Sequence, residues 1–244
     1  MKNGFTLVEL SIVMVIIGLL VGGVLVGQSL IESAKIQGQV RQIQQYAIIV
    51  KSFKDKFKQI PGDSILFTPA GNNNGCFNEY GNACLGGLNL ADEPMAFWRH
   101  LSDSNLIDKD YSEIFGASGG VAGVNYPKAA FDNMAITVTG VNGSNAVFSV
   151  LADSGLVKIY LYSAAKYTQT GSVSFPSPKP NVALVAAIDL KIDDGIPLRG
   201  EFNAFVGGSA SFCYDTSDVT GPYKTSAPDA VCSFILKLDE PKIF

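Results

Sequence analysis

The segment from Leu10 to Ile31 carries no charged residue, and this run constrains the chain more than any other feature. An α-helix of about 20 residues, each rising ~1.5 Å, covers the ~30 Å hydrocarbon core of a bilayer. The sequence therefore predicts a membrane-spanning helix. Glu9 directly precedes the run, and a carboxylate at the edge of a bilayer is costly unless it faces a partner. Glu9 is therefore a candidate functional residue.

The helical pattern continues beyond the apolar run without a helix breaker. Apolar residues recur there at spacings of three and four, which places them on one face of an amphipathic helix. The stop is Pro61-Gly62, because proline disfavours helical geometry at the residue before it. We expect one helix from about Phe5 to about Gln59, roughly 80 Å long at ~1.5 Å per residue. Its apolar face consists of Ile36, Val40, Ile43, Ala47, Val50, Phe53, Phe57 and Ile60.

The first nine residues have a distinctive order. A short leader with one lysine ends in Gly4, and Phe5-Thr6-Leu7-Val8-Glu9 follows. This order resembles the N-terminus of type IV prepilins and of type II secretion pseudopilins, and the resemblance extends to about Asp63. It implies cleavage by prepilin peptidase between Gly4 and Phe5, and N-methylation of Phe5. It also implies assembly with other pilin or pseudopilin subunits into a filament through the N-terminal helix.

The resemblance and the hydropathy pattern together divide the chain into three parts. Residues 1–4 are the leader, residues 5–60 the long helix and residues 61–244 an exported globular domain. Within the helix, residues 5–30 are expected to lie first in the membrane and then in the filament core, while residues 31–60 form an amphipathic spine. The implied location is the bacterial inner membrane, crossed once, with the domain on the extracytoplasmic side. A pilus and a secretion pseudopilus fit the sequence equally well.

Glu9 is interpreted as the residue that fixes axial register in such a filament. Its carboxylate can pair with the freed amine of Phe5 on a neighbouring subunit, and this opposite charge partly offsets desolvation. An acid that extends to the membrane interface is the alternative. The small-residue repeats Gly18 to Gly22 and Gly23 to Gly27 favour close approach of helices, although such repeats also occur without a partner. These glycines are also expected to loosen the helix, each by up to ~1 kcal/mol relative to alanine.

The sequence leaves other functions to compare with a filament subunit. An ordinary secretory signal peptide fits badly, because the apolar run is longer than usual and Glu9 has no place in it. A membrane-anchored extracytoplasmic protein that binds a ligand through its cysteine-bracketed loops, without polymerising, stays open as the alternative. An enzyme is not expected. The sole histidine, His100, stands beside Trp98 and Leu101 on a predicted helix, where a packed or surface side chain is the simpler explanation.

The rest of the chain predicts an α+β, pilin-like fold in which the long helix packs on a domain with an antiparallel sheet. A short helix is predicted at 92–101, and an alanine-rich helix at 181–195 with a buried strand as its rival. Runs rich in β-branched and aromatic residues predict the strands. These runs are 135–139, 146–150, 157–162 and, as an edge strand near the C-terminus, 234–238.

Four cysteines, Cys76, Cys84, Cys213 and Cys232, all follow the apolar run. Exported thiols meet an oxidising compartment and usually pair. Spacing favours Cys76 with Cys84 and Cys213 with Cys232, but three connectivities are open. A zinc site is disfavoured, because closely spaced cysteine pairs are absent from the sequence.

Asp189, Asp193 and Asp194 are weak candidates for calcium ligands, because calcium takes several carboxylate and carbonyl oxygens in a flexible loop. The major pseudopilins that the N-terminus resembles carry a structural calcium near their C-terminus. A helix end followed by an Asp-Gly turn is the simpler explanation, and no other cofactor is expected. The net charge of -4 gives no general attraction to nucleic acid, so nucleic-acid binding is unsupported.

Overall fold

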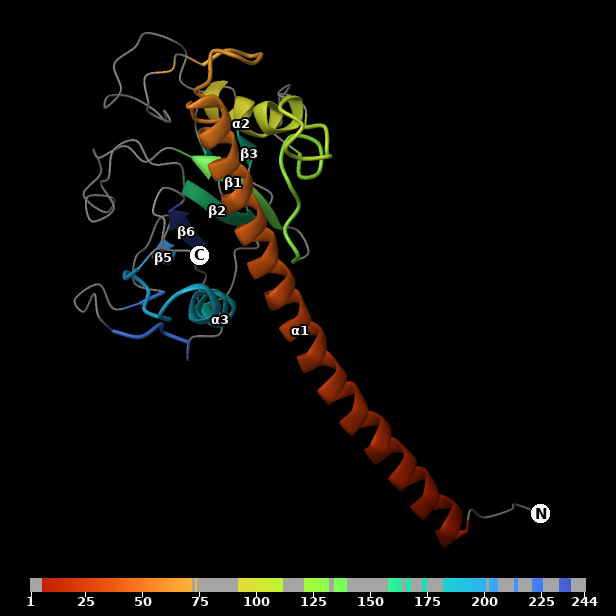
Figure 1. The fold of residues 1–244 in the computed structure, drawn as a ribbon. Coiled ribbons are helices and arrows are strands. Elements are labelled where there is room, and N and C mark those ends of the chain that lie inside the picture. The colour runs from red at the N-terminus through yellow and green to blue at the C-terminus, as the bar shows by residue number, and fades with distance from the viewer. Residues whose placement is uncertain are drawn as a thin grey trace.

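The computed structural model shows a long helix whose second half lies along a globular part and whose first half projects away from it (Figure 1). The N-terminus lies at the far end of the projecting half. The structure describes residues 6–71, 73, 92–111, 121–131, 134–139, 158–163, 166–167, 173–174, 182–200, 202–205, 213–214, 221–225 and 233–237.

Helix α1 runs from Leu7 to Phe57, which is 51 residues, and confirms the predicted long helix. It begins and ends about two residues inside the predicted bounds. Thr6 is the N-cap, so the helix starts after it. At the other end Lys58 adopts a left-handed conformation with φ 56°, and its amide donates to the carbonyl of Lys54 at 2.8 Å. This C-cap ends the helix before Pro61 is reached. The helix is continuous through the four predicted loosening glycines.

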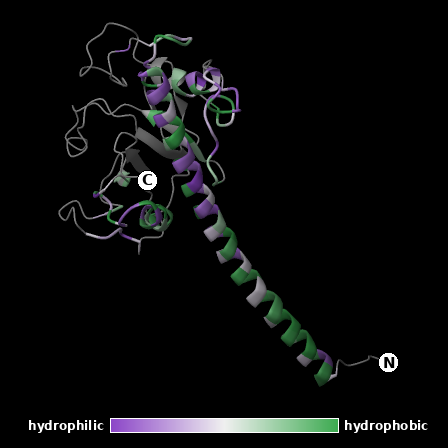
Figure 2. Cartoon of the chain, in the orientation of Figure 1, coloured by the Kyte–Doolittle hydropathy of each residue, from purple (hydrophilic) through white to green (hydrophobic). Residues whose placement is uncertain are grey.

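The second half of α1 buries one face against the globular part. Its buried residues recur at the predicted helical spacing, and Ile43 and Phe53 are fully buried. Figure 2 shows the change along α1, from an almost continuous hydrophobic surface in the projecting half to alternating polar and apolar residues beside the domain. The buried set is Ile36, Gln39, Val40, Ile43, Ala47, Val50 and Phe53. Gln39 is the one position in it that the apolar pattern did not include.

Gln39 and Gln42 hold α1 to the chain segment around residue 130. The amide of Ala130 donates to Oε1 of the fully buried Gln39 at 2.9 Å. Nε2 of Gln42 donates to the carbonyl of Lys128 at 2.7 Å. The first bond satisfies the buried Gln39 side chain, which would otherwise be costly to bury, and together the two bonds fix the segment on the helix.

Four strands pair in the order β1-β2-β6-β5, and each neighbouring pair is antiparallel. In the β1–β2 pair Met134 lies opposite Ser163, and the ladder extends to Thr139 opposite Lys158. Strands β1, β2 and β6 coincide with runs predicted as strands, whereas 146–150 lies outside the described residues. The strands are β1 (Met134–Thr139), β2 (Lys158–Ser163), β5 (Phe202–Phe205) and β6 (Ser233–Lys237), with a separate pair β3 (Lys166–Tyr167) and β4 (Val173–Ser174).

Two short helices complete the described part, and both were predicted. Helix α2 (Asp92–Asp103) packs on α1 through aromatic rings. Trp98 makes edge contacts with Tyr46 at 4.8 Å and with Phe97 at 5.0 Å between ring centroids. Helix α3 (Val182–Ile192) contacts α1 and has Val185 and Ile188 fully buried. A helix rather than the rival buried strand therefore forms here.

His100, the sole histidine, ties α2 to the segment that follows α1. Its side chain is fully buried. The amide of Gly62 donates to Nδ1 at 2.9 Å, and Nε2 lies 2.7 Å from the carbonyl of Pro69. Because Nδ1 must accept, Nε2 carries the proton and donates to Pro69, so this geometry fixes the neutral tautomer. Burial lowers the pKa of His100. Both ring nitrogens therefore hold backbone groups.

We predict that acid destabilises the protein partly through His100. Below the ordinary histidine pKa of about 6.5, the unfolded chain binds a proton at His100, whereas the buried ring stays neutral in the folded chain. The free energy of unfolding therefore decreases as the pH is lowered through this range. Replacement by glutamine removes this titration. Unfolding of the full chain in detergent, followed by the fluorescence of its single tryptophan, measures both forms between pH 8 and 5. Equal pH slopes for wild type and His100→Gln would contradict the prediction.

Candidate functional site

The N-terminus of α1 is closed by a reciprocal pair of side chains, Thr6 and Glu9. The amide and hydroxyl of Thr6 each donate to Oε2 of Glu9 at 2.8 Å, and the amide of Glu9 donates to the Thr6 hydroxyl at 3.3 Å. This arrangement is a capping box, which satisfies helix amides that have no partner within the helix. Glu9 is also in the first turn, where the helix dipole favours negative charge. The Glu9 carboxylate therefore has a defined position within its own chain.

The half of α1 that follows Glu9 is uncovered. Its large apolar side chains are exposed, with Met14 at 71% and Leu19 at 72% of their full accessible area. By length and composition the helix suffices to cross a membrane, and none of its most apolar window is buried. Soluble monomers rarely expose apolar surface of this extent, which marks a membrane or protein contact. The uncovered half is therefore the candidate functional surface.

The glycines of this half have no packing partner in the described part of the chain. A Cβ added at Gly18, Gly22, Gly23 or Gly27 would meet no atom within 4 Å. By contrast, a Cβ at Gly38 on the covered half would lie 3.8 Å from the Cβ of Ala130. Nothing within the described fold therefore requires small residues at the first four positions, which leaves contact with other helices as a reason for them.

Several predicted site residues lie outside the described residues. Gly4 and Phe5, the expected cleavage and methylation positions, are among them, as are Cys76, Cys84 and Cys232. Cys213 is described and fully buried. The disulfide connectivity therefore stays a prediction.

The three candidate calcium ligands do lie together. One carboxylate oxygen from each of Asp189, Asp193 and Asp194 falls within 4.8 Å of the others. Asp189 is fully buried and accepts from the amide of Gly195 at 3.4 Å and from the hydroxyl of Tyr223 at 2.7 Å.

The other two carboxylates also hold the loop. Asp193 accepts from the amide of Phe202 at 3.2 Å and Asp194 from the amide of Ile196 at 2.8 Å. Arg199 lies 4.0 Å from Asp194 and adds positive charge. These bonds engage four carboxylate oxygens, whereas calcium needs six to eight oxygen ligands directed at one point. The described hydrogen bonds brace the turn after α3, and the calcium site stays a prediction.

Burial raises the pKa of Asp189 to about 7, while the hydrogen bonds from Tyr223 and Gly195 oppose that rise. The neighbouring carboxylates of Asp193 and Asp194 raise it further. Tyr223 is 34 positions away in the sequence, so no local signal indicated this pair. The capping box, by contrast, has a recognisable sequence pattern, a threonine followed three residues later by a glutamate. The sequence interpretation of Glu9 as an intermolecular group overlooked this pattern.

Residues 1–25 match the family described as the prokaryotic N-terminal methylation motif. This is the prepilin-type cleavage and methylation signature, so the resemblance of the N-terminus is confirmed. The match ends within the uncovered half of α1. Comparisons with curated proteins and with solved structures gave no match.

We predict that Tyr223 and Asp189 stabilise the domain as a coupled pair. Tyr223→Phe should lower the free energy of unfolding by about 1–3 kcal/mol, because a buried carboxylate loses its donor. After Asp189→Asn the same change should cost clearly less, because the acceptor is then neutral. A double-mutant cycle from denaturant unfolding measures this coupling. Additive effects, within about 0.5 kcal/mol, would contradict the pairing.

Proposed function

We propose that the protein is a non-enzymatic structural subunit of a type IV pilus-like or type II secretion pseudopilus filament. Prepilin peptidase cuts the precursor between Gly4 and Phe5, and Phe5 becomes N-methylated. Helix α1 anchors the subunit in the bacterial inner membrane with the domain outside the cytoplasm. The subunit then polymerises through residues 7–30. The observation that carries this proposal is a prepilin-type motif at the head of a helix whose first half its own domain leaves uncovered.

Assembly transfers the uncovered half of α1 from lipid to protein. Lipid tails are as apolar as leucine, so burial alone gives little gain when a membrane helix enters a filament core. Close packing at small residues supplies part of the gain, and the four glycines, which have no packing partner among the described residues, suit that role. An ion pair at Glu9 supplies the axial register, since an unpaired charge at any other register is costly.

The capping box is compatible with this second role of Glu9. Oε2 receives both hydrogen bonds from Thr6. Among the described residues, Oε1 of Glu9 has no hydrogen-bond donor in this structure. A freed amine of Phe5 on a neighbouring subunit can therefore reach Oε1 without displacing Thr6. The two roles use different oxygens of one carboxylate.

We predict that Glu9→Gln blocks filament assembly while leaving α1 and the fold intact. The glutamine oxygen still accepts from Thr6, so the cap is retained, whereas the charge needed for the ion pair is lost. Filament yield, measured by shearing and electron microscopy, should fall at least about tenfold, the effect of losing ~1.4 kcal/mol. Asp55→Asn, which neutralises an exposed acid on the same helix, is the matched control.

Processing is measured on the same variants by intact mass after co-expression with a prepilin peptidase. Loss of Met1 to Gly4 and gain of one methyl group are expected in each. An uncleaved wild-type chain would favour the alternative, an anchored binding protein that does not polymerise. Normal filaments from Glu9→Gln, with none from Glu9→Ala, would reduce Glu9 to a helix cap.

We also predict that Gly22→Leu leaves the isolated subunit unaffected but reduces filament yield. Apart from its own helical turn, the added Cβ meets no atom of the described residues within 4 Å, and leucine is a better helix former than glycine. A packed helix, however, would have to move outward to admit it. Gly38→Ala is the control, because its new Cβ makes an ordinary contact with Ala130. Thermal unfolding and filament yield together test this, and an unchanged yield would argue against close packing at Gly22.

A further inference from the structure

The outer face of α3 is apolar and uncovered. The helix buries Val185, Ile188 and Asp189 against the fold. On the other side Leu190 is 70% exposed, more than any other large apolar residue described outside the first half of α1. A helix that is apolar on all sides normally has a cover on each of them, and the described part of the chain leaves this side open. The outer face consists of Ala183, Ala186, Ala187 and Leu190, at spacings of three and four.

A second apolar surface lies on the loop that follows α1, residues 61–71, here called the tip loop. Ile65 is 54% exposed and Leu66 is 58% exposed. The loop beneath them is firmly held. Both ring nitrogens of His100 bond to its backbone, and Phe67 packs its ring against two phenylalanine rings of α1. Ile65 and Leu66 are therefore presented to solvent by a loop of defined conformation.

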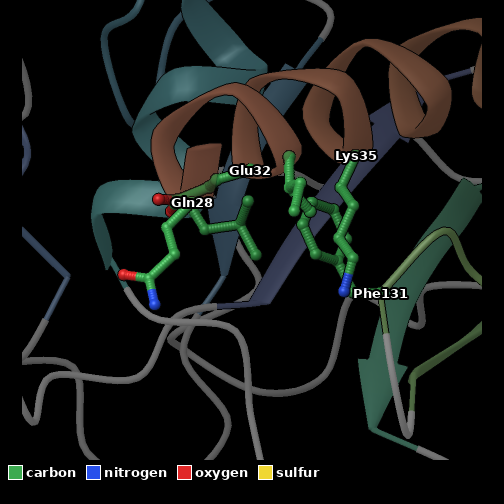
Figure 3. A pocket seen from close by; sticks show the side chains of 6 residues that line it. Gln28, Glu32, Lys35 and Phe131 are labelled. Carbon is green, nitrogen blue, oxygen red and sulfur yellow. The ribbon is translucent and has the colours of Figure 1, made fainter. Parts of the chain in front are cut away.

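The two surfaces lie at opposite ends of the globular part. In Figure 1 the tip loop follows the end of α1 that is farthest from the N-terminus, whereas α3 lies at the end nearest the projecting half. The hollow in Figure 3 marks the level of α3 along the long helix, because Gln28 and Glu32 line it from α1 and Leu184 lines it from the buried face of α3. From Glu32 to Phe57, at the end of α1, the helix rises by roughly 40 Å.

This distance matches the length of the uncovered half of α1. The stretch from Leu7 to Ile31 is about 25 residues long, which is also close to 40 Å. If one copy is shifted along the helix axis by this length, its uncovered half lies beside the covered half of a second, parallel copy. Its α3 then comes to the level of the second copy's tip loop. Such a head-to-tail contact repeats into an open filament rather than a closed dimer.

We propose that the outer face of α3 in one subunit receives Ile65 and Leu66 from the tip loop of the next subunit toward the membrane. The alanines let the loop approach α3 closely, and Leu190 packs beside its two apolar side chains. The partner is thus a second copy of this chain. This inference deepens the proposed function and rests on it, because it adds a contact between domains to the contact between N-terminal helices.

The contact becomes available only when subunits leave the membrane. Anchored copies lie at one depth, so the tip loop of one copy is roughly 40 Å above the level of α3 in its neighbour. The contact is also weak alone, because a few side chains bury far less than the ~800 Å² per partner of a stable complex. Packing of the N-terminal helices supplies the high effective concentration at which it forms.

Charge substitutions test the contact in filaments. Leu66→Asp and Leu190→Lys each place a charge in the apolar contact, and each should lower filament yield by at least about fivefold. Both side chains are exposed, so the fold should be unaffected. The double variant should regain yield over either single variant, because the aspartate of one subunit then meets the lysine of the next. Val124→Asp places the same charge at an exposed apolar residue outside both surfaces and is the matched control.

Cysteine cross-linking tests the same contact without filaments. Full chains that carry Leu66→Cys or Leu190→Cys are purified separately in detergent, where copies are free to shift along each other, and are mixed under mild oxidation. The mixture should give at least about fivefold more disulfide-linked pairs than either variant alone, because a disulfide needs Cα atoms within about 7 Å. In membranes, before assembly, the same mixture should give none. Val124→Cys mixed with Leu190→Cys is the control.

The outcomes separate this contact from the proposed function. Cross-linking between two Leu66→Cys chains that equals the mixture would overturn the head-to-tail contact. Normal filaments from Leu66→Asp would overturn it too, and would leave the filament subunit intact. A loss of yield in Leu190→Lys alone, without rescue in the double variant, would also overturn it and assign α3 to another partner such as the membrane surface. A wild-type chain that is never cleaved would refute the filament subunit, while the detergent mixture would still decide whether the two surfaces meet.

Discussion

The structure depends on one continuous helix that must satisfy two environments. Ile43 and Phe53 on its second half are fully buried against the domain, while Met14 on its first half is 71% exposed. Because an α-helix is stiff, the buried contacts that fix the second half also fix the direction of the first half. The domain therefore determines how the uncovered surface is presented, and a partner that covers this surface necessarily orders the domains as well.

Local sequence signals predicted what depends on local structure. The spacing of apolar residues predicted α1 and its buried face, and capping and turn residues predicted α2 and α3. The predicted bounds of α1 were wrong by about two residues at each end. Thr6 caps the helix after the predicted start, and Lys58 caps it before the predicted end. Contacts between distant segments were not predictable. His100 bonds to Gly62 and Pro69, 38 and 31 positions away, and no local pattern links either position to the histidine.

The same distinction explains the candidate site. Asp189, Asp193 and Asp194 were recognised as a group because they are close in sequence, and the structure does bring their carboxylates together. Their use depends on Tyr223, Phe202 and other donors that no local pattern indicates. A run of acids is therefore an ambiguous signal. The hydrogen bonds show that these residues brace the turn after α3, whereas their use as calcium ligands stays a prediction.

In the proposed filament, Glu9 would combine its local role as a cap with a second role in contact with a neighbouring subunit. Its hydrogen bonds with Thr6 hold the carboxylate in one orientation before any neighbour arrives. Ordering a long side chain on association opposes binding by about 0.5–1.5 kcal/mol, and here that ordering has already occurred. The helix dipole further stabilises its negative charge where water is scarce. A carboxylate fixed in this way can select one register among closely packed helices, because at any other register the same rigid charge would be left without its partner.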